Sequence, residues 1–454
     1  MKKSFYGIVC LVFLVLAFAN VCEAKSFAKI DKLLKSSSDL DKTATIAISV
    51  KDAQSGAVEF EYNQNKLLHT ASTLKLFSTA AAIDTLGEDY QFKTAFYTCG
   101  NDLYIKLGAD PRLTKEGLKD LVKELRSQNL KNFNNVYFDD SIFDRQEWGT
   151  GWMWDNDTNP YMPKFSAYNL DGNVINVTAG ESANGDVKIA SSSKYPMSVV
   201  NLLSFGQGTK FMVNRYDWTN PEVVELIGTI KGKTTVTVPI SSMRRYFIYV
   251  LNDLFSTYNI KIKNASYNSK LIPSDANKVA EVTTPVSAVY TSILQNSDNK
   301  DAETLFKVAT ANKYSATATS ELESRFFKEY WNGKRVPSDS ISIADASGAS
   351  RNNLVSVDWM TNALVKIYNN DSLYQTLKYN MAQPGDGTLS TRLFDLRGEA
   401  WLKTGSLAGV SGITGFVTDK KGKTYVVAIL IQNFVTEPKN VKAFEDEVIK
   451  VIYE

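Results

Sequence analysis

Residues 71–83 read ASTLKLFSTAAAI, a stretch whose apolar residues recur with the spacing of a helix. Lys75 stands where such a helix normally carries an apolar side chain. A lysine in apolar surroundings needs a polar partner. Ser72 precedes Lys75 by three residues, so a helix places both side chains on one face, one turn apart. We therefore expect the two side chains to interact.

This pair has the chemistry of a nucleophile and its base. A serine in the first turn of a helix lies near free backbone N–H groups and the positive end of the helix dipole, which favour an oxyanion. Apolar surroundings lower the pKa of a lysine, so a fraction of Lys75 is neutral and can accept the proton of Ser72. Ser-x-x-Lys also occurs by chance, so further motifs must decide between the two interpretations.

The sequence contains one histidine, His69, among 454 residues. A Ser-His-Asp triad, a Cys-His pair or a zinc site built on histidine would each depend on it, and no Cys/His cluster has metal-ligand spacing. We expect no metal, no cofactor and a base other than histidine, with His69 a solvated residue ahead of the helix. The net charge of +2, with basic residues spread along the chain, gives no support to nucleic-acid binding.

The N-terminus predicts a cleaved signal peptide over residues 1–24. Two lysines are followed by an apolar run, and a small-residue site ends at Ala24. The run is shorter than the roughly 20 residues that span a bilayer, which favours cleavage over a retained anchor. Cleavage leaves Cys99 as the single cysteine, so we expect no intrachain disulfide in the exported chain.

The two ends of the chain predict one α+β domain. Residues 43–63 alternate as two strands around a turn at 53–56. Three further strands are predicted at 399–407, 412–419 and 424–433, and a helix at 438–454. We expect an antiparallel sheet built from both chain ends and flanked by helices.

Residues 95–275 have a different pattern, with many short alternating segments separated by turn residues. We expect a β-rich region of two nested modules here. It would be inserted into a single domain formed by residues 25–94 and 276–454.

Two further motifs follow the insertion. Residues 297–299 read SDN, where Ser297 can relay a proton and the amide of Asn299 can bind a substrate. Residues 403–405 read KTG at the end of a predicted strand, where a glycine lets a ligand approach the strand edge. Each motif alone is more typical of a turn or a strand end. The ordered set S-x-x-K, S-D-N and K-T-G is the signature of penicillin-binding proteins and class A β-lactamases.

Five other segments extend this resemblance over nearly the whole chain: GWMWDND at 151–157, SAYNLDGN at 166–173, DASGASR at 345–351, GDGTLSTR at 385–392 and LKTGSLAGVSGITG at 402–415. Together with the motifs, they resemble the D-alanyl-D-alanine carboxypeptidases/endopeptidases of the S13 peptidase family, the low-molecular-mass class C penicillin-binding proteins. The resemblance implies a penicillin-binding-protein/serine β-lactamase-like transpeptidase domain with a large insertion between the first and second motifs.

The resemblance also implies roles for single residues. Ser72 would be acylated by the penultimate D-alanine carbonyl, with Lys75 as base and Ser297 passing the proton to the leaving amine. Backbone N–H groups of Ser72 and Ser406 would hold the oxyanion. The substrate amide would meet Asn299, and the terminal carboxylate of the substrate would be held by Lys403, Thr404 and Ser406. Gly405, between them, would also belong to the substrate-binding residues. The family usually has threonine in place of Ser406, and serine keeps the hydroxyl.

A substrate pocket is expected at the edge of the insertion. Asp155 and Asp157 lie beside two tryptophans in the 151–157 segment, and Arg351 ends the DASGASR segment. These three side chains could hold the ammonium and carboxylate of a diaminopimelic acid residue. The alternative is that the 151–157 residues are ordinary packing and turn residues.

The expected function is that of a periplasmic serine DD-peptidase that cuts D-Ala-D-Ala termini or D-Ala-diaminopimelate cross-links of peptidoglycan stem peptides. β-Lactams would inhibit it covalently, and peripheral contact with the membrane or with wall-synthesis complexes is a further expected partnership. One alternative is a serine β-lactamase, which in class A needs a glutamate after S-D-N to activate water. The other is a silent wall-binding protein, against which the intact motif residues argue.

Overall fold

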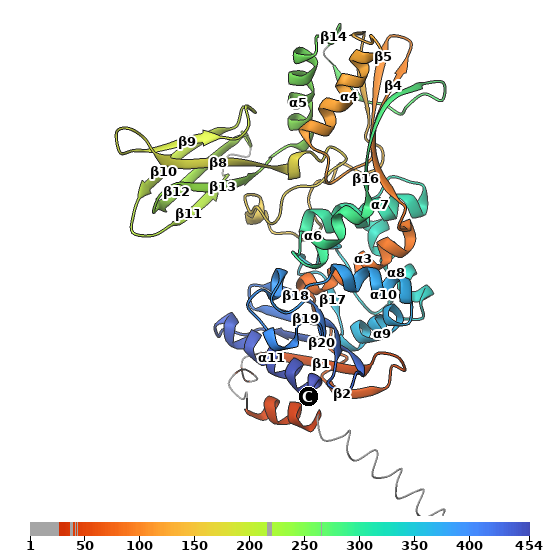
Figure 1. The fold of residues 1–454 in the computed structure, drawn as a ribbon, viewed down its shortest axis with the longest axis vertical. Helices are drawn as coiled ribbons and strands as arrows, with labels where there is room; N and C mark the ends of the chain where they lie inside the picture. The colour runs from red at the N-terminus through yellow and green to blue at the C-terminus, as the bar shows by residue number, and fades with distance from the viewer. Residues whose placement is uncertain (1–26, 37–39, 41, 43, 216–219, 265) are drawn as a thin grey trace, which may run out of the picture.

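The structure is a computed structural model that describes residues 27–36, 40, 42, 44–215, 220–264 and 266–454. The predicted signal peptide, residues 1–24, lies outside these described residues. Within them, no helix is long and apolar enough to cross a membrane. The described chain forms an elongated molecule in which the inserted region stands on a domain built from both chain ends (Figure 1).

The domain at the chain ends contains a five-stranded antiparallel sheet in the order β18-β19-β20-β1-β2. Its strands are β18 (Ala400–Leu407), β19 (Val410–Thr418), β20 (Thr424–Gln432), β1 (Thr45–Asp52) and β2 (Val58–Tyr62). The N-terminal hairpin joins the C-terminal strands along β1, which pairs with β20 from Thr45 opposite Gln432. The expected sheet from both chain ends is confirmed, and β18, which carries the KTG motif, is an edge strand.

Helices cover both faces of this sheet. Along β1, Ala47 packs into the core beneath α3 (Leu74–Leu86) and α9 (Val357–Tyr368), whereas Ile46 and Ile48 pack toward α11 (Pro438–Tyr453). Because both faces are covered, β1 is a nearly continuous apolar run. Further helices of the domain are α6 (Tyr290–Leu294), α7 (Asn299–Tyr314), α8 (Ser320–Gly333) and α10 (Asp371–Asn380), and described residues 27–36 are also helical.

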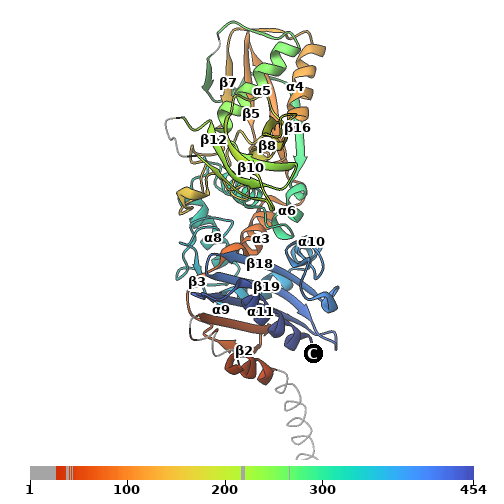
Figure 2. The ribbon, with the colours of Figure 1, turned by 90° about the vertical axis from the view of Figure 1, so that its left-hand side faces the viewer.

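The helix that carries Lys75, α3, is enclosed on nearly all sides. Ten of its 13 residues are buried, including the small side chains of residues 78–82. Small residues let α7 and α8 approach closely, and a helix buried all round shows little amphipathic contrast. In both views α3 lies between the five-stranded sheet and the inserted region (Figures 1 and 2).

The inserted region begins and ends with a pair of antiparallel strands, β4 (Gln91–Cys99) and β16 (Asn277–Pro285). These belong to a second five-stranded sheet in the order β15-β7-β5-β4-β16. Its other strands are β5 (Asp102–Leu107), β7 (Val136–Asp139) and β15 (Tyr267–Ser269). The expected boundaries at 95 and 275 cut through β4 and leave out β16, although the two strands pair with each other. We therefore propose that the insertion extends from about residue 91 to about residue 285.

Two helices, α4 (Lys115–Ser127) and α5 (Met243–Thr257), pack in this region, which the sequence led us to describe only as β-rich. The sequence does contain a cap residue and an apolar spacing that predict α4. Thr114 caps the helix by accepting the Gly117 N–H at 3.2 Å, and the buried residues Leu118, Leu121, Val122 and Leu125 follow helical spacing.

A second part of the insertion projects sideways from the first in Figure 1 and consists of two three-stranded sheets. One contains β8 (Val174–Glu181), β9 (Val187–Ser191) and β13 (Thr234–Pro239), and the other β10 (Ser198–Phe205), β11 (Lys210–Asn214) and β12 (Val223–Ile230). We propose that these sheets form the inner of two nested modules. Four short strands form two two-stranded sheets: β6 (Asn132–Phe133) pairs with β14 (Lys261–Ile262), and β3 (Leu68–His69) pairs with β17 (Leu354–Val355).

Candidate active site

The first motif occupies the junction of two helical segments. Ser72 lies in the short 3₁₀ helix η1 (Ala71–Thr73), which leads directly into α3. Ser72 is half-buried, whereas Lys75 is 0% exposed. The Nζ of Lys75 donates a hydrogen bond to the Oγ of Ser72 over 2.9 Å. The structure thus brings together the two residues that the i, i+3 spacing pairs.

Lys75 has two other acceptors. Its Nζ donates to Oδ1 of Asn299 over 2.5 Å and to the carbonyl oxygen of Ser347 over 2.8 Å. Together with Ser72 Oγ they match the three N–H bonds of an ammonium. Burial lowers the pKa of Lys75 to about 8, although nearby carboxylates, Asp345 first among them, act to raise it. A substantial fraction of Lys75 is therefore neutral near pH 8 and able to accept a proton.

The second and third motifs are also joined by a hydrogen bond from a lysine to a serine. Nζ of Lys403, on β18, donates to Oγ of Ser297 over 3.0 Å and to the Thr404 carbonyl over 2.9 Å. Lys403 is 0% exposed, and burial holds its pKa well below the usual range, with the charge of Lys75 as a further cause. Ser297 has the left-handed φ of +65° in the link between α6 and α7. Its hydroxyl therefore lies beside a lysine that can exist without charge.

The glycine of the KTG motif sets how closely β18 approaches η1. A Cβ atom on Gly405 would lie 2.9 Å from the backbone nitrogens of Ser72 and Thr73, a separation that real Cβ atoms essentially never show. Only glycine therefore allows this approach. Thr404 and Ser406, its neighbours on the edge strand, are half-buried and exposed, respectively.

Sequence reasoning gave no role to the loop before Arg351, although it flanks the site. Asp345 accepts hydrogen bonds from the Gly348 and Ser350 N–H groups at 2.8 and 2.7 Å, and from Nε1 of Trp152 at 2.7 Å. Gly348 has φ +79°, and a Cβ there would lie 1.8 Å from the Ala71 carbonyl oxygen. The loop thus packs directly against η1, and this packing brings the Ser347 carbonyl within hydrogen-bond distance of Lys75 Nζ.

Comparison with known proteins settles the family. The model of the D-Ala-D-Ala carboxypeptidase 3 (S13) family matches residues 27–452. This chain belongs to that family. It is accordingly a serine peptidase of the D-Ala-D-Ala carboxypeptidase type, and the resemblance inferred from the motifs is confirmed.

Relatives of this S13 peptidase include the D-alanyl-D-alanine carboxypeptidase DacB of Haemophilus influenzae, which is 25% identical over 427 residues and covers 87% of each chain. A crystal structure of penicillin binding protein 4 (dacB) from Haemophilus influenzae has a TM-score of 0.82 at 23% identity, covering 94% of this chain and 99% of that one. The structure of that protein complexed with a β-lactam has a TM-score of 0.77 at 22% identity, with the same coverage. The likeness confirms the fold class.

The inserted region of the S13 peptidase contacts the second motif. Nδ2 of Asn299 donates to the Tyr161 carbonyl over 2.8 Å and lies 3.2 Å from Sδ of Met162. Asn299 therefore links Lys75 on one side to the insertion on the other.

The three residues expected to hold diaminopimelic acid have different surroundings. Arg351 donates to the Ala408 carbonyl over 2.5 Å, next to the end of β18. Asp157 is ion-paired with Arg215 at 2.5 Å and lies 3.6 Å from Lys164, so its charge is already compensated. Asp155 is exposed in the 3₁₀ helix η2 (Trp154–Asn156). Their role stays a prediction, with Asp155 the more available of the two carboxylates.

His69 lies in β3 and is half-buried, not in the solvated lead-in that we expected. The difference arises because residues 68–69 pair with β17, with His69 opposite Leu354. The His69 carbonyl accepts a hydrogen bond from Gln432 at 3.3 Å, so its backbone is used structurally.

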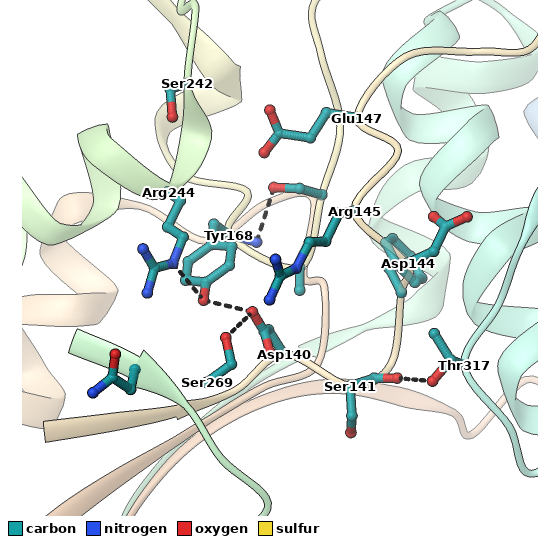
Figure 3. Close-up of a pocket in the computed structure, with 14 residues that line it drawn as sticks. Asp140, Ser141, Asp144, Arg145, Glu147, Tyr168, Ser242, Arg244, Ser269 and Thr317 are labelled. Atoms are coloured by element: carbon teal, nitrogen blue, oxygen red, sulfur yellow. Dashed lines mark hydrogen bonds between the residues drawn. The ribbon is translucent and has the colours of Figure 1, made fainter.

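A separate cavity of about 520 Å³ is lined mostly by the inserted region, with Thr317 of the other domain at its edge (Figure 3). Ser72 and Lys75 do not line it. Asp140 accepts the hydroxyls of Tyr168 and Ser269, each at 2.8 Å, and Nε of Arg244 donates to the Tyr168 hydroxyl at 3.3 Å. The Tyr168 hydroxyl therefore links Arg244 to Asp140 within the insertion.

Proposed function

We propose that this S13 peptidase acts in the periplasm on peptidoglycan stem peptides, cutting D-Ala-D-Ala termini or D-Ala-diaminopimelate cross-links through an acyl-enzyme on Ser72. The observation that carries the proposal is the buried contact of 2.9 Å between Lys75 Nζ and Ser72 Oγ. With its pKa lowered to about 8, a fraction of Lys75 is neutral already below that pH and can act as a base.

In the acylation step, Ser72 Oγ attacks the penultimate D-alanine carbonyl while Lys75 takes the hydroxyl proton. Backbone N–H groups of Ser72 and Ser406 would stabilise the oxyanion. Ser297, 3.0 Å from Lys403, would donate a proton to the amine as the C–N bond breaks, so that D-alanine or the diaminopimelate amine leaves. The proton that Lys75 took from Ser72 would replace the one given up by Ser297, which returns both residues to their starting forms. Water then attacks the ester and restores Ser72.

The buried position of Lys403 refines its role. Nζ of Lys403 already donates to Ser297 Oγ and to the Thr404 carbonyl. Lys403 would therefore attract the terminal carboxylate by its charge, with Ser297 between the two groups. The hydroxyls of Thr404 and Ser406, on the edge strand, are the more accessible donors to that carboxylate. A substrate chain beside β18 could also pair with the free edge of the sheet.

β-Lactams would acylate the same serine, because their ring carbonyl takes the place of the peptide carbonyl. A protein of the same fold from Haemophilus influenzae has been solved with a β-lactam, which supports this part of the proposal. Burying the amine of Lys75 beside Ser72 costs free energy. A wall-binding protein without catalytic activity would gain nothing that offsets this cost.

The proposal is tested by incubating the protein with purified peptidoglycan fragments. A pentapeptide stem should lose one D-alanine, and a cross-linked dimer should yield two monomers, as measured by mass spectrometry. Ser72→Ala should leave both fragments intact. A wild-type protein that acts on neither fragment contradicts the proposed function.

A further inference from the structure

A buried carboxylate, Glu303, lies behind the catalytic pair. It is on α7, one helical turn after Asn299, and is 2% exposed. Its Oε1 accepts the Ser347 N–H at 2.8 Å, and its Oε2 accepts the Ala346 N–H at 3.2 Å. The carbonyl of the same residue, Ser347, accepts the hydrogen bond of Lys75 at 2.8 Å. One loop residue thus connects this carboxylate to the base.

We propose that Glu303 is a positioning residue for acylation, which fixes Ser347 so that its carbonyl holds Lys75 beside Ser72, and whose negative charge stabilises the ammonium form of Lys75. The inference rests on the proposed function and adds a residue to it. Glu303 is enclosed and both its oxygens are occupied by backbone N–H groups, so it is not placed to activate a solvent water in the manner of a class A β-lactamase glutamate.

The charges around Lys75 make this role testable. Lys403 faces it from β18, Glu303 from α7 and Asp345 from the loop, and the N-cap residue of α7, Asp298, is a further carboxylate near it. Asp345 is held by donors from its own loop and from Trp152, so its place does not depend on Glu303.

Glu303 itself has charged neighbours on each side. Burial, with Asp345 as a further cause, raises the pKa of Glu303 to about 7, so Glu303 is mostly ionised in the pH range where Lys75 titrates. On its other side, Glu323 of α8 lies near Lys307, which is ion-paired with Asp144 at 2.6 Å. Burial raises the pKa of Glu323 well above the usual value, and the charge of Glu303 acts in the same direction.

The direction of the effect follows. An ionised Glu303 favours the ammonium of Lys75, so removing the charge lowers the pKa of Lys75 further and makes the neutral base available at lower pH. At the same time, a glutamine keeps only one acceptor for the two backbone N–H groups, so the loop is held less firmly. Glu303→Gln should shift the rising limb of the acylation profile to lower pH and reduce its plateau.

The experiment measures the second-order rate constant of acylation by benzylpenicillin against pH. In Glu303→Gln the midpoint, which is the pH at which the rate constant reaches half of its maximum, should fall by roughly one unit. The maximum rate constant itself should fall by about tenfold. Glu303→Asp keeps the charge but shortens the side chain, so its midpoint should stay while the rate falls. Glu323→Gln is the matched control, because it changes a second buried carboxyl, on α8, for which the described residues show no hydrogen bond to Lys75 or to the 345–350 loop. It should leave the profile unchanged.

A folded Glu303→Gln protein with an unmoved midpoint overturns the inference, whatever its rate. If Glu303→Gln does not fold, a wild-type rate in Glu303→Asp overturns it. Failure of the proposed function is distinct, because there the wild-type protein itself would leave both peptidoglycan fragments intact.

Discussion

Nζ of Lys403 lies 3.0 Å from Oγ of Ser297, in a contact that joins the third motif to the second. The corresponding contact in the first motif joins Lys75 to Ser72 at 2.9 Å. Each serine therefore has its own buried lysine, and burial lowers the pKa of both lysines. The site holds two hydroxyl–amine pairs, one suited to forming the acyl-enzyme and one to protonating the leaving amine.

Lys75→Arg should abolish acylation although it keeps the positive charge. A guanidinium does not lose its proton in proteins and cannot serve as base. Labelling with a fluorescent penicillin measures the effect, and thermal unfolding checks that the variant is folded. A folded Lys75→Arg protein labelled at the wild-type rate would show that Lys75 is not the base.

His69→Ala should leave turnover within a few-fold of wild type. Gln432 donates a hydrogen bond to the backbone carbonyl of His69, and the substitution keeps this carbonyl. Release of D-alanine from a stem peptide is the measurement. A large loss here, together with a small one for Lys75→Arg, would reverse the assignment of the base.

Acylation should increase with pH as Lys75 loses its proton, with half of the increase reached near pH 8. The sign follows because burial lowers the pKa of Lys75, so the neutral form that accepts the serine proton appears above that value. The rate constant for benzylpenicillin measured between weakly acid and weakly alkaline pH checks it. A profile that is flat across pH 8 contradicts Lys75 as the titrating base.

Gly405→Ala should slow acylation by more than tenfold and destabilise the protein by about 1–3 kcal/mol, the usual cost of overpacking. The added methyl would lie 2.9 Å from the backbone nitrogens of Ser72 and Thr73, so β18 or η1 must move. Gly232→Ala is the matched control, because nothing lies within 4 Å of a Cβ there. Equal behaviour of the two variants in labelling and thermal unfolding would refute the close approach.

Arg351→Ala should lower kcat/KM for diaminopimelate-containing peptides roughly ten- to a hundredfold, about 1.4 to 2.7 kcal/mol for a charge-assisted contact. Acylation by benzylpenicillin, which lacks that side chain, should change much less. Losses of equal size on both would mean that Arg351, through its bond to the Ala408 carbonyl, supports the end of β18 instead.

The parts of the fold that local patterns specify could be predicted from the sequence. The helical spacing of residues 71–83 places Lys75 on Ser72, and alternation at both chain ends gives the strands of the first sheet. The helix α4 also follows a local pattern, but the short alternating segments around it led us to describe the whole insertion as β-rich.

Contacts made by the backbone, or between distant parts of the chain, could not be predicted in the same way. The Ser347 carbonyl binds Lys75, yet every residue has a carbonyl, so no residue type marks it. Asp157 pairs with Arg215, 58 residues away, and no spacing rule links the two. Glu303 accepts hydrogen bonds from Ala346 and Ser347, more than 40 residues away, and no local pattern distinguishes it from other glutamates on helices.

Mapping the covalent penicillin adduct tests the central claim most directly. The protein is labelled with a fluorescent penicillin, digested, and the modified peptide is identified by mass spectrometry. The account predicts an adduct on the peptide that contains Ser72 and none in a folded Ser72→Ala protein. A Ser72→Ala protein that still forms the adduct, or a wild-type adduct on another residue, would contradict it.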